Sequence, residues 1–168
     1  MGIYGGFKMY KILALDQASR QSGYSIFKDN ELIKFGTIKL EDENVGARLV
    51  QLRQSIKFLI AENQIDYVVF EDIQMQTSVG NNVKTFKVLA NVFGVILELC
   101  EELKIKYDIV SSNTWKSTLK IKGRNRAEQK KNAQLFVEET YGVHCTQDEA
   151  DAICIGTHAY NTIGYYWG

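Results

Sequence analysis

Proline is absent from this 168-residue chain, and cysteine is scarce. Without proline there can be no proline-rich linker between two folded parts. The three cysteines, Cys100, Cys145 and Cys154, are an odd number, and none belongs to a CxxC motif. This pattern argues against a disulfide framework and against a zinc site. It predicts reduced thiols, and therefore a cytoplasmic location.

Membrane-spanning runs and a net charge of either sign are missing as well. The longest apolar stretch, residues 88–100, is interrupted by polar residues and is too short to cross a bilayer. Residues 1–8 lack the apolar core and the cleavage site of a secretory signal. We expect them to be a leader or tag outside the folded domain. The remaining chain is long enough to bury one proper core. We expect a single domain over residues 9–163.

The order of apolar runs and helical patterns predicts an α/β fold. The expected strands cover residues 10–16, 22–27, 31–40, 66–72 and 106–110, and the expected helices cover 45–63, 82–103, 126–141 and 148–161. The first three strands follow one another with short turns and should be antiparallel, whereas the last two are separated by helices and should be parallel. We therefore expect a five-stranded mixed sheet flanked by helices.

Four acidic residues stand where apolar elements begin or end. Asp16 closes the run ILAL, Glu71 closes the run YVVF, and Asp148 and Asp151 lie three residues apart on the last expected helix. Acids beside buried strands are rarely left without a partner or a metal ion. If the two strands are neighbours, the repulsion between their carboxylates would be relieved by a divalent cation. Such oxygen ligands suit Mg²⁺ or Mn²⁺, and two ions about 4 Å apart can cleave a phosphodiester.

The acids of the last helix also have a simpler interpretation. Negative charge in the first turn of a helix complements the helix dipole. Thr146 or Asp148 would then be the N-cap, and Glu149 and Asp151 would only stabilise the helix end. The sequence leaves both uses open.

Three segments carry a resemblance to a known family. They are LALDQASRQSGYSIF (13–27), VVFEDIQMQ (68–76) and DEADAICIGTHAY (148–160). In this order they resemble the three acidic motifs of RuvC-type Holliday junction resolvases, which belong to the ribonuclease-H-like superfamily. The resemblance extends from about residue 9 to residue 160.

The resemblance implies a ribonuclease-H-like fold and the activity of a crossover junction endodeoxyribonuclease, an enzyme of DNA recombination and repair. Such an enzyme is a homodimer that binds four-way DNA junctions and makes paired symmetric nicks with Mg²⁺, for which Mn²⁺ can substitute. By position in the motifs, the catalytic carboxylates and ligands of two ions would be Asp16, Glu71, Asp148 and Asp151.

Two segments depart from the family pattern. Gln17 and Ala18 stand where the family commonly has a Pro-Gly pair, and the loop after Glu71 is not a clear match to the cellular enzymes. These departures favour a phage-like or viral branch of the family, which would act in the host cytoplasm.

Positive charge is concentrated between residues 113 and 134, although the chain as a whole is neutral. The stretch is either a solvated surface or a contact for DNA phosphates. The resemblance places a lysine near the scissile phosphate, for which Lys130 is the first candidate and Lys122 the second. The predicted DNA-binding residues are Lys116, Lys120, Lys122, Arg124, Arg126, Lys130, Lys131, Asn82 and Lys84.

Several alternatives remain open at this stage. The apolar face within residues 88–97 is explained by core packing, and the resemblance adds a dimer contact. His158 is interpreted as a structural histidine with its polar atoms satisfied. A general fork or flap nuclease and a non-catalytic DNA-binding relative are the alternative functions. A phosphotransferase of the actin and sugar-kinase type fits poorly, because the chain has no second glycine-rich phosphate loop.

Overall fold

A five-stranded mixed sheet forms the centre of the fold. The computed structural model describes residues 10–74 and 82–163. The strands are β1 (Lys11–Asp16), β2 (Gln21–Lys28), β3 (Glu31–Lys39), β4 (Tyr67–Glu71) and β5 (Lys106–Val110), in the order β3-β2-β1-β4-β5. β1, β2 and β3 pair antiparallel, whereas β4 pairs parallel with both β1 and β5. The predicted sheet, three antiparallel strands followed by two parallel ones, is therefore confirmed.

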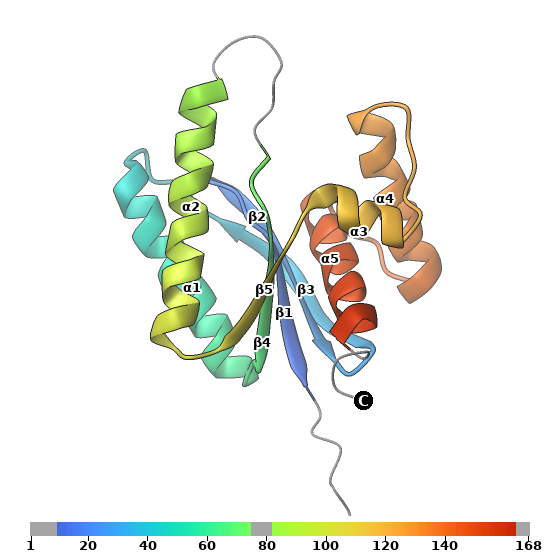
Figure 1. The fold of residues 1–168 in the computed structure, drawn as a ribbon, viewed down its shortest axis with the longest axis horizontal. Helices are drawn as coiled ribbons and strands as arrows, with labels where there is room; N and C mark the ends of the chain where they lie inside the picture. The colour runs from blue at the N-terminus through green and yellow to red at the C-terminus, as the bar shows by residue number, and fades with distance from the viewer. Residues whose placement is uncertain (1–9, 75–81, 164–168) are drawn as a thin grey trace, which may run out of the picture.

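Helices cover both faces of the sheet. Within the described residues they are α1 (Val45–Asn63), α2 (Asn82–Glu102), α3 (Ser112–Thr118), α4 (Arg126–Tyr141) and α5 (Gln147–Ile163). Figure 1 shows α1 and α2 on one side of the sheet and α3, α4 and α5 on the other. No described helix is both long enough and apolar enough to cross a membrane.

Helix α3 was not predicted from the sequence. The Oγ atom of Ser111 accepts a hydrogen bond from the backbone N–H of Thr114 and caps the helix. Trp115, which is 1% exposed, anchors the helix in the core. A seven-residue helix with one large apolar residue is too short to show a helical periodicity, so no sequence pattern indicates it.

Side chains of the central strand β1 alternate between two cores. Leu13 and Leu15 belong to the core shared with α1 and α2, whereas Ile12 and Ala14 belong to the core shared with α4 and α5. Successive side chains of a strand point to opposite faces. Asp16 continues the series of Ile12 and Ala14, and it therefore faces the side of the sheet that α5 covers.

The apolar face of α2 packs largely into the fold. Val92 and Ile96 are buried in the core on the α1 side. Phe93 contacts Phe70 of β4 with 5.2 Å between the ring centroids. The core interpretation of this face is confirmed for these residues, and a dimer contact through α2 stays a prediction.

Candidate active site

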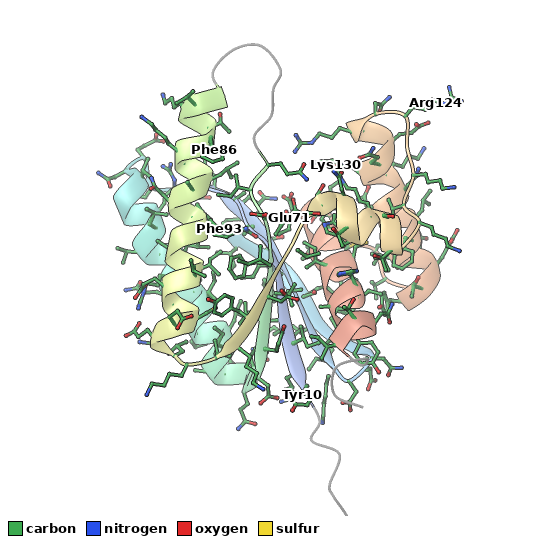
Figure 2. All side chains as sticks on the ribbon, in the orientation of Figure 1. Tyr10, Glu71, Phe86, Phe93, Arg124 and Lys130 are labelled. Atoms are coloured by element: carbon green, nitrogen blue, oxygen red, sulfur yellow. The ribbon has the colours of Figure 1, made fainter. Side chains whose placement is uncertain are left out.

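The pairing of β1 with β4 brings Asp16 and Glu71 side by side. The parallel register ends with Leu15 opposite Phe70, so the next residue of each strand is an acid. Glu71 follows the same alternation as Val69, which belongs to the core on the α5 side. Both carboxylates therefore lie at the carboxyl ends of their strands and on one face of the sheet. Figure 2 labels Glu71 at this end of β4.

Helix α5 delivers the other two acids to the same place because β2 carries a glycine there. Gly23 is paired with Asp16 across the β1–β2 ladder. A Cβ atom at Gly23 would lie 2.0 Å from the carbonyl oxygen of Asp148. The missing side chain thus allows the first turn of α5 to sit directly on β2, beside Asp16.

The start of α5 separates the capping acid from the site acids. The Oγ1 atom of Thr146 accepts a hydrogen bond from the N–H of Glu149 at 3.2 Å, and the Oε1 atom of Glu149 accepts one from the N–H of Thr146 at 2.9 Å. This reciprocal pair is a capping box. Asp148, the alternative cap, instead accepts a hydrogen bond from Gln21. Capping therefore accounts for Glu149, and it leaves Asp148 and Asp151 to the site.

All four predicted carboxylates line one pocket of about 450 Å³. Its wall also contains three of the predicted basic residues, and the full lining consists of Asp16, Gln17, Ala18, Glu71, Asp72, Ile73, Gln74, Leu89, Ser112, Asn113, Trp115, Lys116, Arg126, Gln129, Lys130, Asp148 and Asp151. Acids from β1, β4 and α5 thus share a single depression, although they are up to 135 residues apart in the sequence.

Burial and the charges of neighbouring acids together raise the pKa values of Asp16 and Asp151. Burial raises the pKa of Asp16 well above its usual range, and Asp151, Glu71 and Asp148 raise it further, while Lys130 opposes them. Burial, followed by the charge of Glu71, raises the pKa of Asp151 to about 6. Burial also raises the pKa of Glu71, despite the opposing effects of Trp115, Lys116 and Arg126. The pocket disfavours four negative charges together and would favour a cation among them.

Two uncharged side chains hold Glu71 in place, and the sequence analysis missed both. The Nε1 atom of Trp115 donates a hydrogen bond to Oε2 of Glu71 at 2.9 Å. The side-chain amide of Gln17 donates to the backbone carbonyl of Glu71 and accepts from its backbone N–H. Neither contact has a local signature, because the partners lie 44 and 54 residues apart in the sequence.

The basic residues fall into two groups. Lys116 and Lys130 are partly buried, and with Arg126 they line the pocket. Figure 2 shows Lys130 on the part of α4 near Glu71, whereas Arg124 lies farther from it. The exposed residues that do not line this pocket are Lys84, Lys120, Lys122, Arg124 and Lys131. Lys130 therefore lines the pocket that holds the four acids, whereas Lys122 does not, and the lysine that lies near the scissile phosphate stays a prediction. The side chain of Asn82 and most of the loop before it lie outside the described residues.

His158 does not line the pocket. Burial lowers the pKa of its imidazole. Its Nδ1 atom is buried and has no hydrogen-bond partner within the described residues. The expectation of a fully satisfied histidine is wrong on this point, because one ring nitrogen is buried without a hydrogen-bond partner among the described residues.

The donor set fits a hard divalent cation. It consists of carboxylate oxygens alone, which are the ligands that Mg²⁺ and Mn²⁺ prefer. Within residues 10–74 and 82–163, no three Asp, Glu, His or Cys side chains stand close enough to form a ready-made ligand group. The acids interact through their charges across one pocket without being gathered to coordination distance.

Comparison with known proteins decides the family. The model of the family described as crossover junction endodeoxyribonuclease RuvC matches residues 12–158. The chain belongs to the RuvC family. The RuvC of Campylobacter curvus is 27% identical over 159 residues, which cover 90% of this chain and 97% of that protein. The RuvC of Campylobacter hominis is 28% identical over an alignment of 170 positions, which covers 92% of this chain and 98% of that protein.

A solved RuvC structure shares the fold. The structure of Thermus thermophilus RuvC in complex with Holliday junction substrate superposes with a TM-score of 0.74 at 14% identity, covering 92% of this chain and 96% of that one. Together with the RuvC family match, this confirms the predicted ribonuclease-H-like fold and the predicted enzyme class, a crossover junction endodeoxyribonuclease. Dependence on a divalent metal ion follows at the family level, and the identity and number of the ions stay predictions.

Proposed function

We propose that this RuvC-family chain resolves four-way DNA junctions by hydrolysing one phosphodiester in each of two opposing strands, using two Mg²⁺ ions per active site. The observation that carries the proposal is the meeting of Asp16, Glu71, Asp148 and Asp151 in one pocket. Loss of one acid would have favoured a non-catalytic DNA-binding relative. All four are present, and they come together from three separate elements.

The four carboxylates would hold the ions, with Asp16 central because the other three acids act on its charge. When bound, the metal would supply activation of the attacking water and stabilisation of the departing 3′ oxygen. Oε2 of Glu71 accepts the Trp115 hydrogen bond, which leaves Oε1 as the oxygen that would bind an ion. The products would be nicked strands with 5′-phosphate ends.

Lys130 would act on the phosphate rather than on the metal. Its ammonium group is near enough to Asp16 and Asp151 to lower the pKa of both carboxyls. A cation at that place can offset the charge that develops on the phosphate during cleavage. Lys116 and Arg126 line the same pocket and would bind the neighbouring phosphates.

The exposed basic residues that do not line the pocket would supply general affinity for DNA. These exposed residues are Lys84, Lys120, Lys122, Arg124 and Lys131. Contacts between such side chains and DNA phosphates make the affinity for DNA fall steeply as the salt concentration rises. Cutting two strands symmetrically requires two active sites. We therefore propose a homodimer, and a phage-like origin remains a prediction from the departures at Gln17 and Ala18.

A cleavage assay with three substrates tests this function. End-labelled four-way junction, Y-fork and linear duplex would be incubated with the protein in Mg²⁺ or in EDTA. We expect paired symmetric nicks in the junction alone, and only with Mg²⁺. Equal cutting of the fork would replace the proposal with a general branched-DNA nuclease. Tight junction binding without cutting in Mg²⁺ or Mn²⁺ would replace it with a non-catalytic relative.

A further inference from the structure

The edge of β4 that carries Glu71 would be incomplete without the side chain of the residue that follows β1. The β1–β4 ladder ends at Leu15 and Phe70, and β1 itself ends one residue later at Asp16, before the turn into β2. Along a strand, the backbone groups of successive residues face opposite neighbours. The N–H of Asp72 bonds to the carbonyl of Val110 in β5, so the N–H and carbonyl of Glu71 face the β1 side.

Gln17 replaces the missing strand residue at this point. Its Oε1 atom accepts a hydrogen bond from the N–H of Glu71 at 3.0 Å, and its Nε2 atom donates to the carbonyl of Glu71. A primary amide offers one acceptor and donors in a plane, as a peptide unit does. The side chain therefore extends the sheet by one rung and satisfies two backbone groups that would otherwise be orphaned.

This rung joins the two acids that open the site. Gln17 is the residue after Asp16, and its side chain forms hydrogen bonds with the backbone of Glu71. The two carboxylates repel each other, and that repulsion favours their separation while no cation is bound. An amide bridge opposes separation without adding charge to the pocket. The Pro-Gly pair common in the family has no side-chain amide and has no such bridge available.

A second glutamine, the first residue of β2, contacts one of the acids of α5. The Nε2 atom of Gln21 donates to Oδ2 of Asp148 at 3.0 Å. This contact is exposed to solvent, whereas the Gln17 contacts are partly buried. Water competes more strongly for an exposed hydrogen bond, so the contribution of Gln21 should be the smaller one.

We propose that Gln17 is a positioning residue that sets the spacing of Asp16 and Glu71 for metal binding, and that Gln21 assists by orienting Asp148. This inference rests on the proposed function, because it assigns the metal to these carboxylates. Residues that orient metal ligands without touching the metal typically change metal affinity by roughly 10–100-fold when they are replaced. Gln17 should fall at the lower end of that range, since it acts on Glu71 through the backbone.

The test compares Gln17→Met, Gln17→Asn and Gln21→Met with Gln51→Met as the matched control. Methionine keeps the length of glutamine and removes both hydrogen-bonding groups. Asparagine keeps the amide but is one methylene too short to reach both groups of Glu71. Gln51 is an exposed residue of α1, away from the pocket. Mn²⁺ affinity would be measured by titration calorimetry, and junction cleavage would be followed across a series of Mn²⁺ concentrations.

We expect Gln17→Met and Gln17→Asn to weaken Mn²⁺ binding about 10-fold and to raise the Mn²⁺ concentration for half-maximal cleavage by the same factor. Saturating Mn²⁺ should restore cleavage to nearly the wild-type rate, and junction binding should not change. Gln21→Met should have a smaller effect, and Gln51→Met none. If Gln17→Met does not unfold cooperatively, Gln17→Asn decides the matter.

Two results would overturn the inference while leaving the proposed function intact. One is wild-type Mn²⁺ affinity in both Gln17 variants. The other is a loss of cleavage that saturating Mn²⁺ does not restore, which would place Gln17 in contact with DNA or in the fold alone. Failure of the wild-type protein to bind Mn²⁺ at all would instead overturn the proposed metal site.

Discussion

Replacing Asp151 by asparagine should stabilise the metal-free protein, although it removes a proposed catalytic group. Burial and the charge of Glu71 raise the pKa of this carboxyl from 3.8 to about 6. Folding therefore takes up a proton between these two values, and stability is lost as the pH rises through that window. Asparagine has nearly the shape of the protonated acid and carries no charge at any pH.

The pKa shift sets the size of the effect. A shift of about 2 units corresponds to about 3 kcal/mol when the carboxyl is fully ionised at pH 7.5, and to about half of that at pH 5. Asp151 keeps some exposure to the pocket, so solvent screening reduces the effect. We expect Asp151→Asn to gain about 1–3 kcal/mol in EDTA at pH 7.5, with a clearly smaller gain at pH 5.

Urea denaturation, followed by tryptophan fluorescence to which the buried Trp115 contributes, measures this difference. The two proteins would be compared at pH 5 and pH 7.5 in EDTA, and again at pH 7.5 in Mg²⁺. Binding of the ion to the native state should stabilise the wild type and should reduce or reverse the advantage of the variant. A destabilised variant in EDTA at pH 7.5, or a gain that is equal at the two pH values, would refute the electrostatic reasoning.

Two further substitutions test the groups around the acids. Lys130→Ala should slow junction cleavage about 100-fold while weakening junction binding much less, because the charge of Lys130 acts on the reacting phosphate. Lys122→Ala, at an exposed position, serves as the control. Equal losses of cleavage rate and binding affinity in Lys130→Ala would make Lys130 a plain phosphate contact. Gly23→Ala should destabilise the fold by about 1–3 kcal/mol and impair cleavage, because its Cβ would collide with the backbone of Asp148. Gly94→Ala, in an open position on α2, should instead raise the free energy of unfolding by about 0.5–1 kcal/mol, as measured by thermal or urea denaturation. A change of the same sign in the two glycine variants would contradict the packing argument.

The acids of the site were predictable because local patterns and topology agree. Asp16 and Glu71 each close an apolar run, and short turns followed by helical crossovers fix which strands pair. Strand alternation then sends both carboxylates to one face. The spacing of Asp148 and Asp151 places them on one side of a helix start. These regularities involve neighbouring residues, so they can be read from the sequence.

The side chains that hold Glu71 in place could not be predicted, because their contacts join residues far apart in the sequence. Gln17 and Trp115 reach Glu71 from distant parts of the chain, and nothing near them in the sequence indicates the partner. The capping role of Glu149 did have a local signature, since Thr-x-x-Glu is the pattern of a capping box. Helical spacing similarly places Arg126 and Lys130 on one face of α4, four residues apart, and both line the pocket.

The proposed site uses four carboxylates to hold the metal that cuts the junction. Its most direct test compares wild type and Asp16→Asn for junction cleavage in Mg²⁺ and for junction binding in EDTA with moderate salt. We expect the variant to fold and to bind the junction with the affinity of the wild type but to make no nicks. Residual cleavage near the wild-type rate would show that Asp16 is not a ligand of the catalytic metal.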